Sequence, residues 1–128
     1  MSVQDGIARD THPRSTRLLL RHLDDLQRRD FRVHGMFIVI GKLRRHDGYH
    51  RRYLLAPYTV AEIAPTLLAR RCDYVVGGFG YRQVKAFCVV EDPHGERLLM
   101  NDRFLVWKLM IETDEREFRR IGSNPPPL

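Results

Sequence analysis

The residues best suited to chemistry are concentrated between positions 42 and 53, where basic and aromatic side chains surround an Asp-Gly pair. The candidate anion-binding set comprises Lys42, Arg44, Arg45, His46, Tyr49, His50, Arg51, Arg52 and Tyr53. Asp47 is the only acidic residue in this stretch. Basic side chains bind phosphates, and tyrosines can stack on unpaired bases. The set therefore predicts docking on nucleic acid or on the acidic surface of a nucleic-acid-handling protein.

The same cluster has an interpretation that needs no partner. Like charges on neighbouring strands repel one another, so a fold that keeps them together favours an anionic ligand. Charged side chains on a hairpin also prevent sheets from pairing edge to edge, which is a purely protective role. The sequence leaves both interpretations open.

The histidines are the starting point for an enzymatic interpretation. His46 and His50 are four residues apart, a spacing that on a helix directs two imidazoles to one metal. Here they flank an expected turn, the glutamate of the zinc-protease motif is missing, and the sequence offers no evident third ligand. His34 or His94 could join them in an acid–base site. An enzyme acting on a phosphorylated or nucleotide substrate stays as one alternative, and no catalytic residue, metal ligand or cofactor is assigned.

The charge of the chain is unevenly distributed. Its 22 basic and 16 acidic residues give a formal net charge of +6. Residues 1–90 carry 16 basic and 8 acidic side chains, a balance of +8, whereas residues 91–128 carry 6 and 8, a balance of −2. An acidic partner would be attracted to the first two thirds of the chain. Most of the basic residues are arginines, whose planar fork suits phosphate and carboxylate.

Composition argues against a membrane-spanning or a secreted protein. No apolar run approaches the roughly 18 residues that a membrane-spanning helix needs, and the N-terminus does not resemble a secretory signal. Cys72 and Cys88 form no CxxC unit, which favours a reducing compartment. We therefore expect a small, non-enzymatic, cytoplasmic binding protein without a membrane partner.

The candidate set needs a hairpin to position it. Residues 36–45 and 49–56 predict two strands, and Asp47-Gly48 between them is a hairpin signal because glycine accepts a positive φ. Upstream, residues 15–29 predict a helix, since leucines recur there at helical spacing.

The rest of the chain predicts further helices and strands. Thr59 to Glu62 matches a capping box, and a helix is expected from there to about residue 71. A Gly-rich loop at 77–80 lacks the lysine of a phosphate-binding loop and predicts a turn. The remaining expected elements are strands at 73–76, 84–91 and 97–100. Residues 104–111 are apolar except for Lys108, so periodicity leaves both helix and strand open there; the charged continuation favours one long helix over 104–120.

These elements predict a single α+β domain in the order α-β-β-α-β-β-β-α. Its mainly antiparallel sheet is built from two hairpins, with helices packed on one face. Residues 15–121 form the domain, 1–14 a flexible arm and 122–128 a disordered, proline-rich tail. A further alternative is a small inhibitor or adaptor of a larger protein machine, with residues 104–111 forming a homodimer interface.

Overall fold

The computed structural model describes residues 13–57, 59–64, 83–87 and 100–123. Within these ranges, two helices, α1 and α2, precede four strands, and two further helices follow them. Their bounds are α1 Pro13–His22, α2 Asp25–His34, β1 Phe37–Arg44, β2 His50–Ala56, β3 Thr59–Ile63, β4 Gln83–Phe87, α4 Met100–Thr113 and α5 Glu115–Ser123. Together they confirm the predicted α+β class and its single domain.

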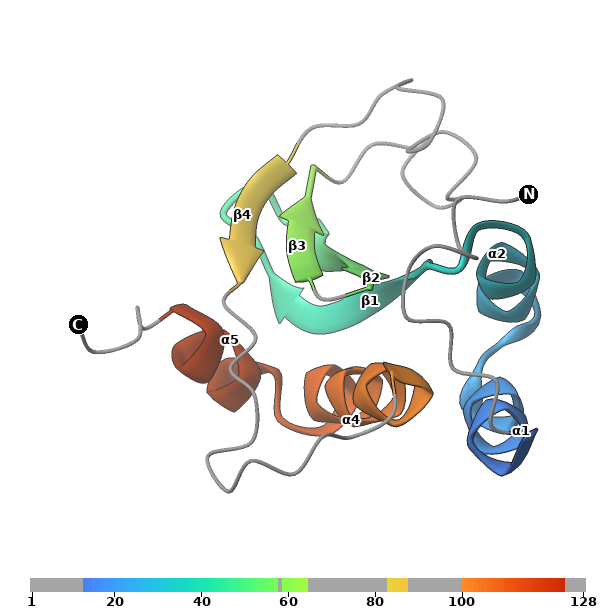
Figure 1. Cartoon of the computed structure of the whole chain (residues 1–128). Helices are drawn as coiled ribbons and strands as arrows, with labels where there is room; N and C mark the ends of the chain where they lie inside the picture. The colour runs from blue at the N-terminus through green and yellow to red at the C-terminus, as the bar shows by residue number, and fades with distance from the viewer. Residues whose placement is uncertain (1–12, 58, 65–82, 88–99, 124–128) are drawn as a thin grey trace.

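The sheet has the strand order β1-β2-β3-β4, and each neighbouring pair is antiparallel. Helices α4 and α5 lie across one face of this sheet (Figure 1), while α1 packs on α4 and α2 lies against β1. Because side chains alternate along a strand, every second residue points to the helices. Val39, Tyr53 and Glu62 share that face, since Val39 pairs with Tyr53 and Tyr53 with Glu62.

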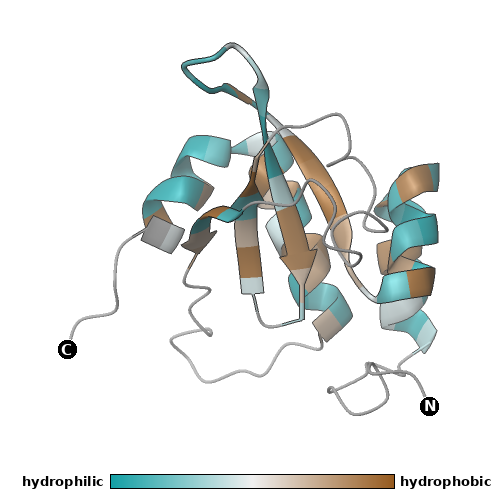
Figure 2. Ribbon diagram, turned by 90° about the horizontal axis from the view of Figure 1, so that it is seen from above, coloured by the Kyte–Doolittle hydropathy of each residue, from teal (hydrophilic) through white to brown (hydrophobic). Residues whose placement is uncertain are grey.

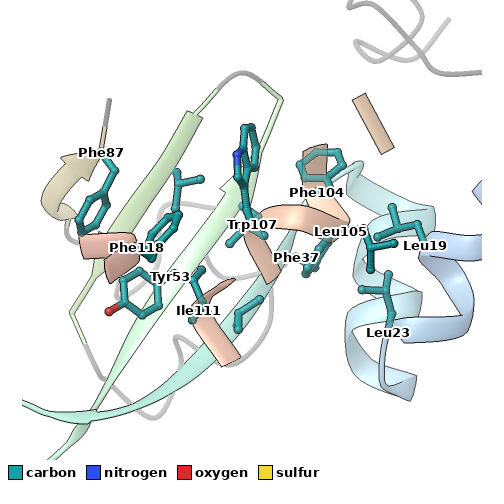
Figure 3. Packing of buried hydrophobic residues seen from close by; sticks show 13 residues of the cluster. Leu19, Leu23, Phe37, Tyr53, Phe87, Phe104, Leu105, Trp107, Ile111 and Phe118 are labelled. Carbon is teal, nitrogen blue, oxygen red and sulfur yellow. The ribbon is translucent and has the colours of Figure 1, made fainter. Parts of the chain in front are cut away.

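The hydrophobic core fills the space between the sheet and the helices (Figure 3). Its aromatic rings are in contact along the whole interface. Phe37 of β1 lies 5.6 Å from Phe104 of α4, and Tyr53 of β2 lies 5.9 Å from Phe118 of α5, measured between ring centroids. Such ring pairs add to the stabilisation that comes from burying their surface.

Helix α4 supplies the middle of this core. Phe104, Trp107 and Ile111 form its inward stripe, at the spacing of a helix face, whereas Val106 and Leu109 are exposed. The predicted helix over residues 104–111 is confirmed. Most of the apolar surface assigned to a homodimer interface therefore packs inside the same chain.

The two long predicted helices are each divided in two. In the first, Asp24 caps a new helix: it accepts a hydrogen bond from the Gln27 backbone N–H at 2.8 Å, and the Gln27 side chain accepts one from the Asp24 N–H at 3.1 Å. This reciprocal cap stops α1 and starts α2. In the second, Asp114 separates α4 from α5, and its carbonyl accepts the Phe118 N–H at 3.1 Å.

The helix predicted from Thr59 is wrong for residues 59–63, which form β3. This strand pairs with β2 on one side and β4 on the other. Two hydrogen-bonded neighbours and β-branched residues at Thr59, Val60 and Ile63 outweigh a local capping signal. The remainder of that predicted helix lies outside the described residues, as do the strand at 73–76 and the glycine loop at 77–80.

The remaining comparisons between prediction and structure concern the residues at which helices and strands begin or end. Met100, expected to end a strand, is the first residue of α4, and 97–99 lie outside the described residues. The predicted strand 84–91 is confirmed as β4 as far as Phe87. Residues 13–14 and 122–123 are helical rather than part of the tails. Among the residues that the structure describes, no helix has the length and apolar character to span a membrane.

Candidate functional site

The predicted hairpin is present, and it extends from the body of the protein (Figure 2). Its turn closes through the Arg45 N–H, which donates to the Tyr49 carbonyl at 2.8 Å, and the Gly48 N–H, which donates to the Arg45 carbonyl at 2.9 Å. Gly48 has a φ of 88°, in the left-handed region that glycine adopts without strain. Asp47 accepts the Tyr49 N–H at 3.1 Å. The Asp-Gly pair thus makes the turn that its residues predict.

A bulge in β1 separates the hairpin from the rest of the sheet. Ile40 pairs with Arg52 and Arg44 pairs with His50, so residues 41–43 of β1 lie opposite a single residue of β2. A bulge of this kind leaves backbone groups unpaired and re-aims the strand. The direction of the hairpin therefore depends on the groups that form hydrogen bonds with the unpaired backbone of residues 41–43.

The carboxylate of Glu115, at the start of α5, satisfies that backbone. One of its oxygens accepts the N–H groups of Lys42 at 2.6 Å and Leu43 at 2.9 Å, and the other accepts the Tyr53 hydroxyl at 2.5 Å. Glu115 is buried, and a Cβ at Gly41 would lie 2.4 Å from its oxygens. Glycine is needed at position 41 for this close approach. We refer to these contacts as the Glu115 clamp.

A second buried carboxylate lies beside the clamp. Glu62 of β3 has no exposed surface, and it accepts hydrogen bonds from Arg51 at 2.9 Å and from Arg119 of α5 at 2.5 Å. Arg119 also donates to the Tyr53 hydroxyl at 3.2 Å. Burial alone would lower the pKa of Arg119, but the hydrogen bonds to Glu62 and Tyr53 outweigh it and raise the pKa. Two carboxylates and two guanidinium groups therefore form one neutral network at the base of the hairpin.

Tyr53 provides a pH-dependent readout of this network. Burial, followed by the hydrogen bond to Glu115, raises the pKa of Tyr53 well above its ordinary value. Its contribution to stability is therefore complete below about pH 10, the pKa of an unperturbed tyrosine, and is lost as the pH rises beyond that. We expect a difference absorbance titration, wild type minus Tyr53→Phe, to show a phenol that ionises later than a free tyrosine. A difference curve centred on the ordinary pKa would contradict the clamp.

Five residues of the predicted set are exposed on the hairpin, and we call them the exposed hairpin tip. They are Lys42, Arg44, His46, Tyr49 and His50. Within the part of the chain that the structure describes, neither Lys42 nor Arg44 forms an ion pair. Tyr49 is 57% exposed, so an aromatic side chain is accessible at the turn. The tip thus presents cations and one aromatic ring together.

The other four residues of the predicted set are withdrawn from the surface. Arg45 lies 3.3 Å from Asp47, Arg51 is held by Glu62, and Arg52 and Tyr53 are buried. Alternation along β2 explains part of this division, because Arg51 and Tyr53 point to the helices. Internal partners thus neutralise part of the charge that the sequence places around the turn.

The network residues Gly41, Glu62, Glu115 and Arg119 were not predicted as functional. One signal for Glu62 was visible: a glutamate in the apolar run 60–63, where an inward-facing charge needs a partner. The capping-box interpretation of that run gave Glu62 a different role. Nothing near Glu115 in the sequence indicates that it contacts a strand 72 residues away.

The histidines do not converge in the described part of the chain. His46 is exposed at the turn, and Nδ1 of His50 lies 3.1 Å from the Gly41 carbonyl oxygen. Across residues 13–57, 59–64, 83–87 and 100–123, no group of three or more His, Cys, Asp or Glu side chains is placed to hold a metal ion. His94 lies outside these ranges.

Comparison with known proteins does not extend this picture. No family model, no curated protein and no solved structure matches the chain.

Proposed function

We propose that this protein is a nucleic-acid-binding module that docks through the exposed hairpin tip. The observation that carries the proposal is the tip itself: a hairpin extending from the body, with exposed cations at Lys42 and Arg44. The neighbouring Arg45 and Asp47 pair with each other, so those two cations determine the charge of the turn. Phosphate neutralisation releases bound counterions, and this release drives association.

The shape and chemistry of the tip favour nucleic acid over an acidic protein surface. A two-stranded ribbon has the dimensions to enter the major groove of a DNA duplex. Tyr49 offers a flat ring beside the cations, the combination with which proteins hold unpaired bases. Protein–protein contacts depend more on buried aromatic and arginine anchors than on a ring of exposed charge. An acidic protein partner is the outcome to expect if nucleic acid does not bind.

The Glu115 clamp supports this role by fixing the hairpin before binding. It bonds the backbone of Lys42 directly, so the first cation of the tip is attached to α5 and not only to β2. Ordering a loop at the moment of binding opposes affinity, and a hairpin that is already fixed avoids most of that penalty. The buried network thus contributes to function without contacting the ligand.

The test is a binding titration with a Lys42→Ser/Arg44→Ser variant. Two unit charges near phosphates contribute about 1 kcal/mol each in water, so the variant should bind roughly thirtyfold more weakly. Fluorescence anisotropy with labelled duplex DNA, single-stranded DNA and single-stranded RNA measures the affinities. A further Tyr49→Ala variant should lose affinity for single strands more than for duplex if the ring stacks on bases.

The matched control is Arg14→Ser/Arg17→Ser on the exposed surface of α1, which removes the same charge elsewhere. It should retain most of the wild-type affinity. If both variants lost the same amount of affinity, binding would depend on overall charge, and the exposed hairpin tip would not be the binding site. Absence of wild-type binding to all three nucleic acids at low salt would overturn the proposal.

A further inference from the structure

A groove of about 410 Å³ lies between α2, β1 and α4, apart from the hairpin tip. Its lining includes Leu26 and Asp30 of α2, Ile40 of β1, and Lys108 and Glu112 of α4. Leu26 and Ile40 are exposed, whereas Asp30 and Lys108 are buried. The groove therefore has an apolar mouth and polar walls.

One wall of the groove is the outer side of β1, which among the described strands pairs with β2 alone. Gln27 of α2 donates its side-chain amide to the Ile38 carbonyl at 3.0 Å, which shows that this carbonyl points away from β2. In an antiparallel pair the outward-pointing residues alternate, so the N–H and C=O of Ile40 point outward as well. At Ile38 the Gln27 side chain takes the place of a neighbouring strand, because it supplies the hydrogen bond that such a strand would make. Among the described residues nothing takes that place at Ile40.

The charge of the groove is negative. Its lining has three carboxylates, from Asp24, Asp30 and Glu112, and one ammonium, from Lys108. Lys108 is paired with Glu112, and Asp30 lies 2.9 Å from Arg29. Asp24 is exposed at the start of α2, where one of its oxygens accepts the Gln27 N–H, and a carboxylate has capacity for further donors. A basic ligand suits this lining.

We propose that the groove binds an extended peptide segment with an arginine or lysine side chain, which adds to the sheet beside Ile40. Main-chain hydrogen bonds to an exposed strand edge give such peptides their affinity, and pockets for alternate side chains give their specificity. Here the Ile40 backbone supplies the hydrogen bonds, and the exposed Asp24 carboxylate at the start of α2 selects the basic side chain. The site is separate from the proposed nucleic-acid contact.

The test uses short blocked peptides of alternating threonine and arginine, with threonine–glutamate peptides of equal length for comparison. Isothermal titration should show binding of the arginine peptide only. Leu26→Lys places a cation at the mouth of the groove and should weaken that binding about fivefold, whereas Leu26→Glu should strengthen it by a similar factor. Equal affinity for both peptides, no binding of either, or no response to the charge at position 26 would each overturn the proposal.

Ile40→Pro tests the hydrogen bonds to the strand edge. Proline removes the outward N–H of residue 40 but no hydrogen bond to β2, a substitution that edge strands tolerate. Peptide binding should be lost while circular dichroism shows an intact fold, and Ile40→Thr should retain binding. The Lys42→Ser/Arg44→Ser variant should bind the peptide like wild type, which separates this site from the hairpin tip. If light scattering instead shows a dimer that Ile40→Pro dissociates, the edge pairs with a second copy and the peptide proposal is contradicted.

Discussion

Glu115→Ala is expected to lower the free energy of unfolding by about 3–5 kcal/mol, because it leaves one buried and two partly buried donors without their acceptor. These are the N–H groups of Lys42 and Leu43 and the hydroxyl of Tyr53. Urea denaturation followed by circular dichroism measures the change. The variant should also bind nucleic acid more weakly at a temperature where it is folded, since the hairpin loses its attachment to α5.

Glu117→Ala is the matched control, because it removes a glutamate two residues further along the same helix. Glu117 pairs with Arg120 on the surface, where solvent screens the interaction, so its loss should have little effect. Gly41→Ala should resemble Glu115→Ala, since the added Cβ occupies the position of the carboxylate. Similar stability for the Glu115 and Glu117 variants would show that the clamp is not what holds the hairpin.

Glu62→Ala is expected to have an effect of similar size, a loss of about 3–5 kcal/mol, because it leaves two partly buried guanidinium groups without their counter-ion. Arg51 and Arg119 both donate to this carboxylate, and neither can lose its charge near neutral pH. Denaturant unfolding of the variant gives the value. Thr59→Ala, at an exposed position of the same strand, should change stability by only about 0.5 kcal/mol.

The network should nevertheless be replaceable as a unit. Replacing Arg51, Glu62 and Arg119 together by apolar residues of similar size removes the ion pairs of Glu62 without stranding an arginine, while Glu115 keeps its hydrogen bonds from Lys42, Leu43 and Tyr53. Such replacements of buried ion pairs are often neutral or stabilising. A triple variant more stable than Glu62→Ala would show that the loss in the single variant comes from the stranded arginines. A triple variant less stable than the single variant would contradict that explanation.

The parts of the fold that were predictable are those decided by neighbouring residues. Asp47-Gly48 determines the turn through the backbone preference of glycine. The position of this turn also predicts where the first flanking strand ends and the second begins. Local signals failed where two of them competed. The leucine spacing in residues 15–29 continues through Asp24, whose cap with Gln27 divides the helix. Thr59 carries a helix-start signal, but pairing with strands on both sides makes it the start of β3.

The sequence predicted where the hairpin lies, but not which of its side chains are exposed. The sequence places nine candidate residues around one turn, and five of them are exposed on the hairpin. The division depends on partners that are distant along the chain: Glu62 binds Arg119 across 57 residues, and Glu115 binds Tyr53 across 62. Alternation along a strand predicts which face of the sheet a side chain lies on. It does not predict which charged residue from a distant part of the chain will contact it. Neutralisation of Arg51 therefore became apparent only with the structure.

The most direct measurement is the salt dependence of nucleic-acid affinity for wild type and for the Lys42→Ser/Arg44→Ser variant. A plot of log affinity against log salt concentration has a slope set by the number of phosphates neutralised, about −0.9 for each on duplex DNA. If the tip contacts phosphates through both residues, the slope of the variant should be shallower by about 2 units. Parallel lines for the two proteins would mean that neither side chain meets a phosphate, and the hairpin would not be the nucleic-acid contact.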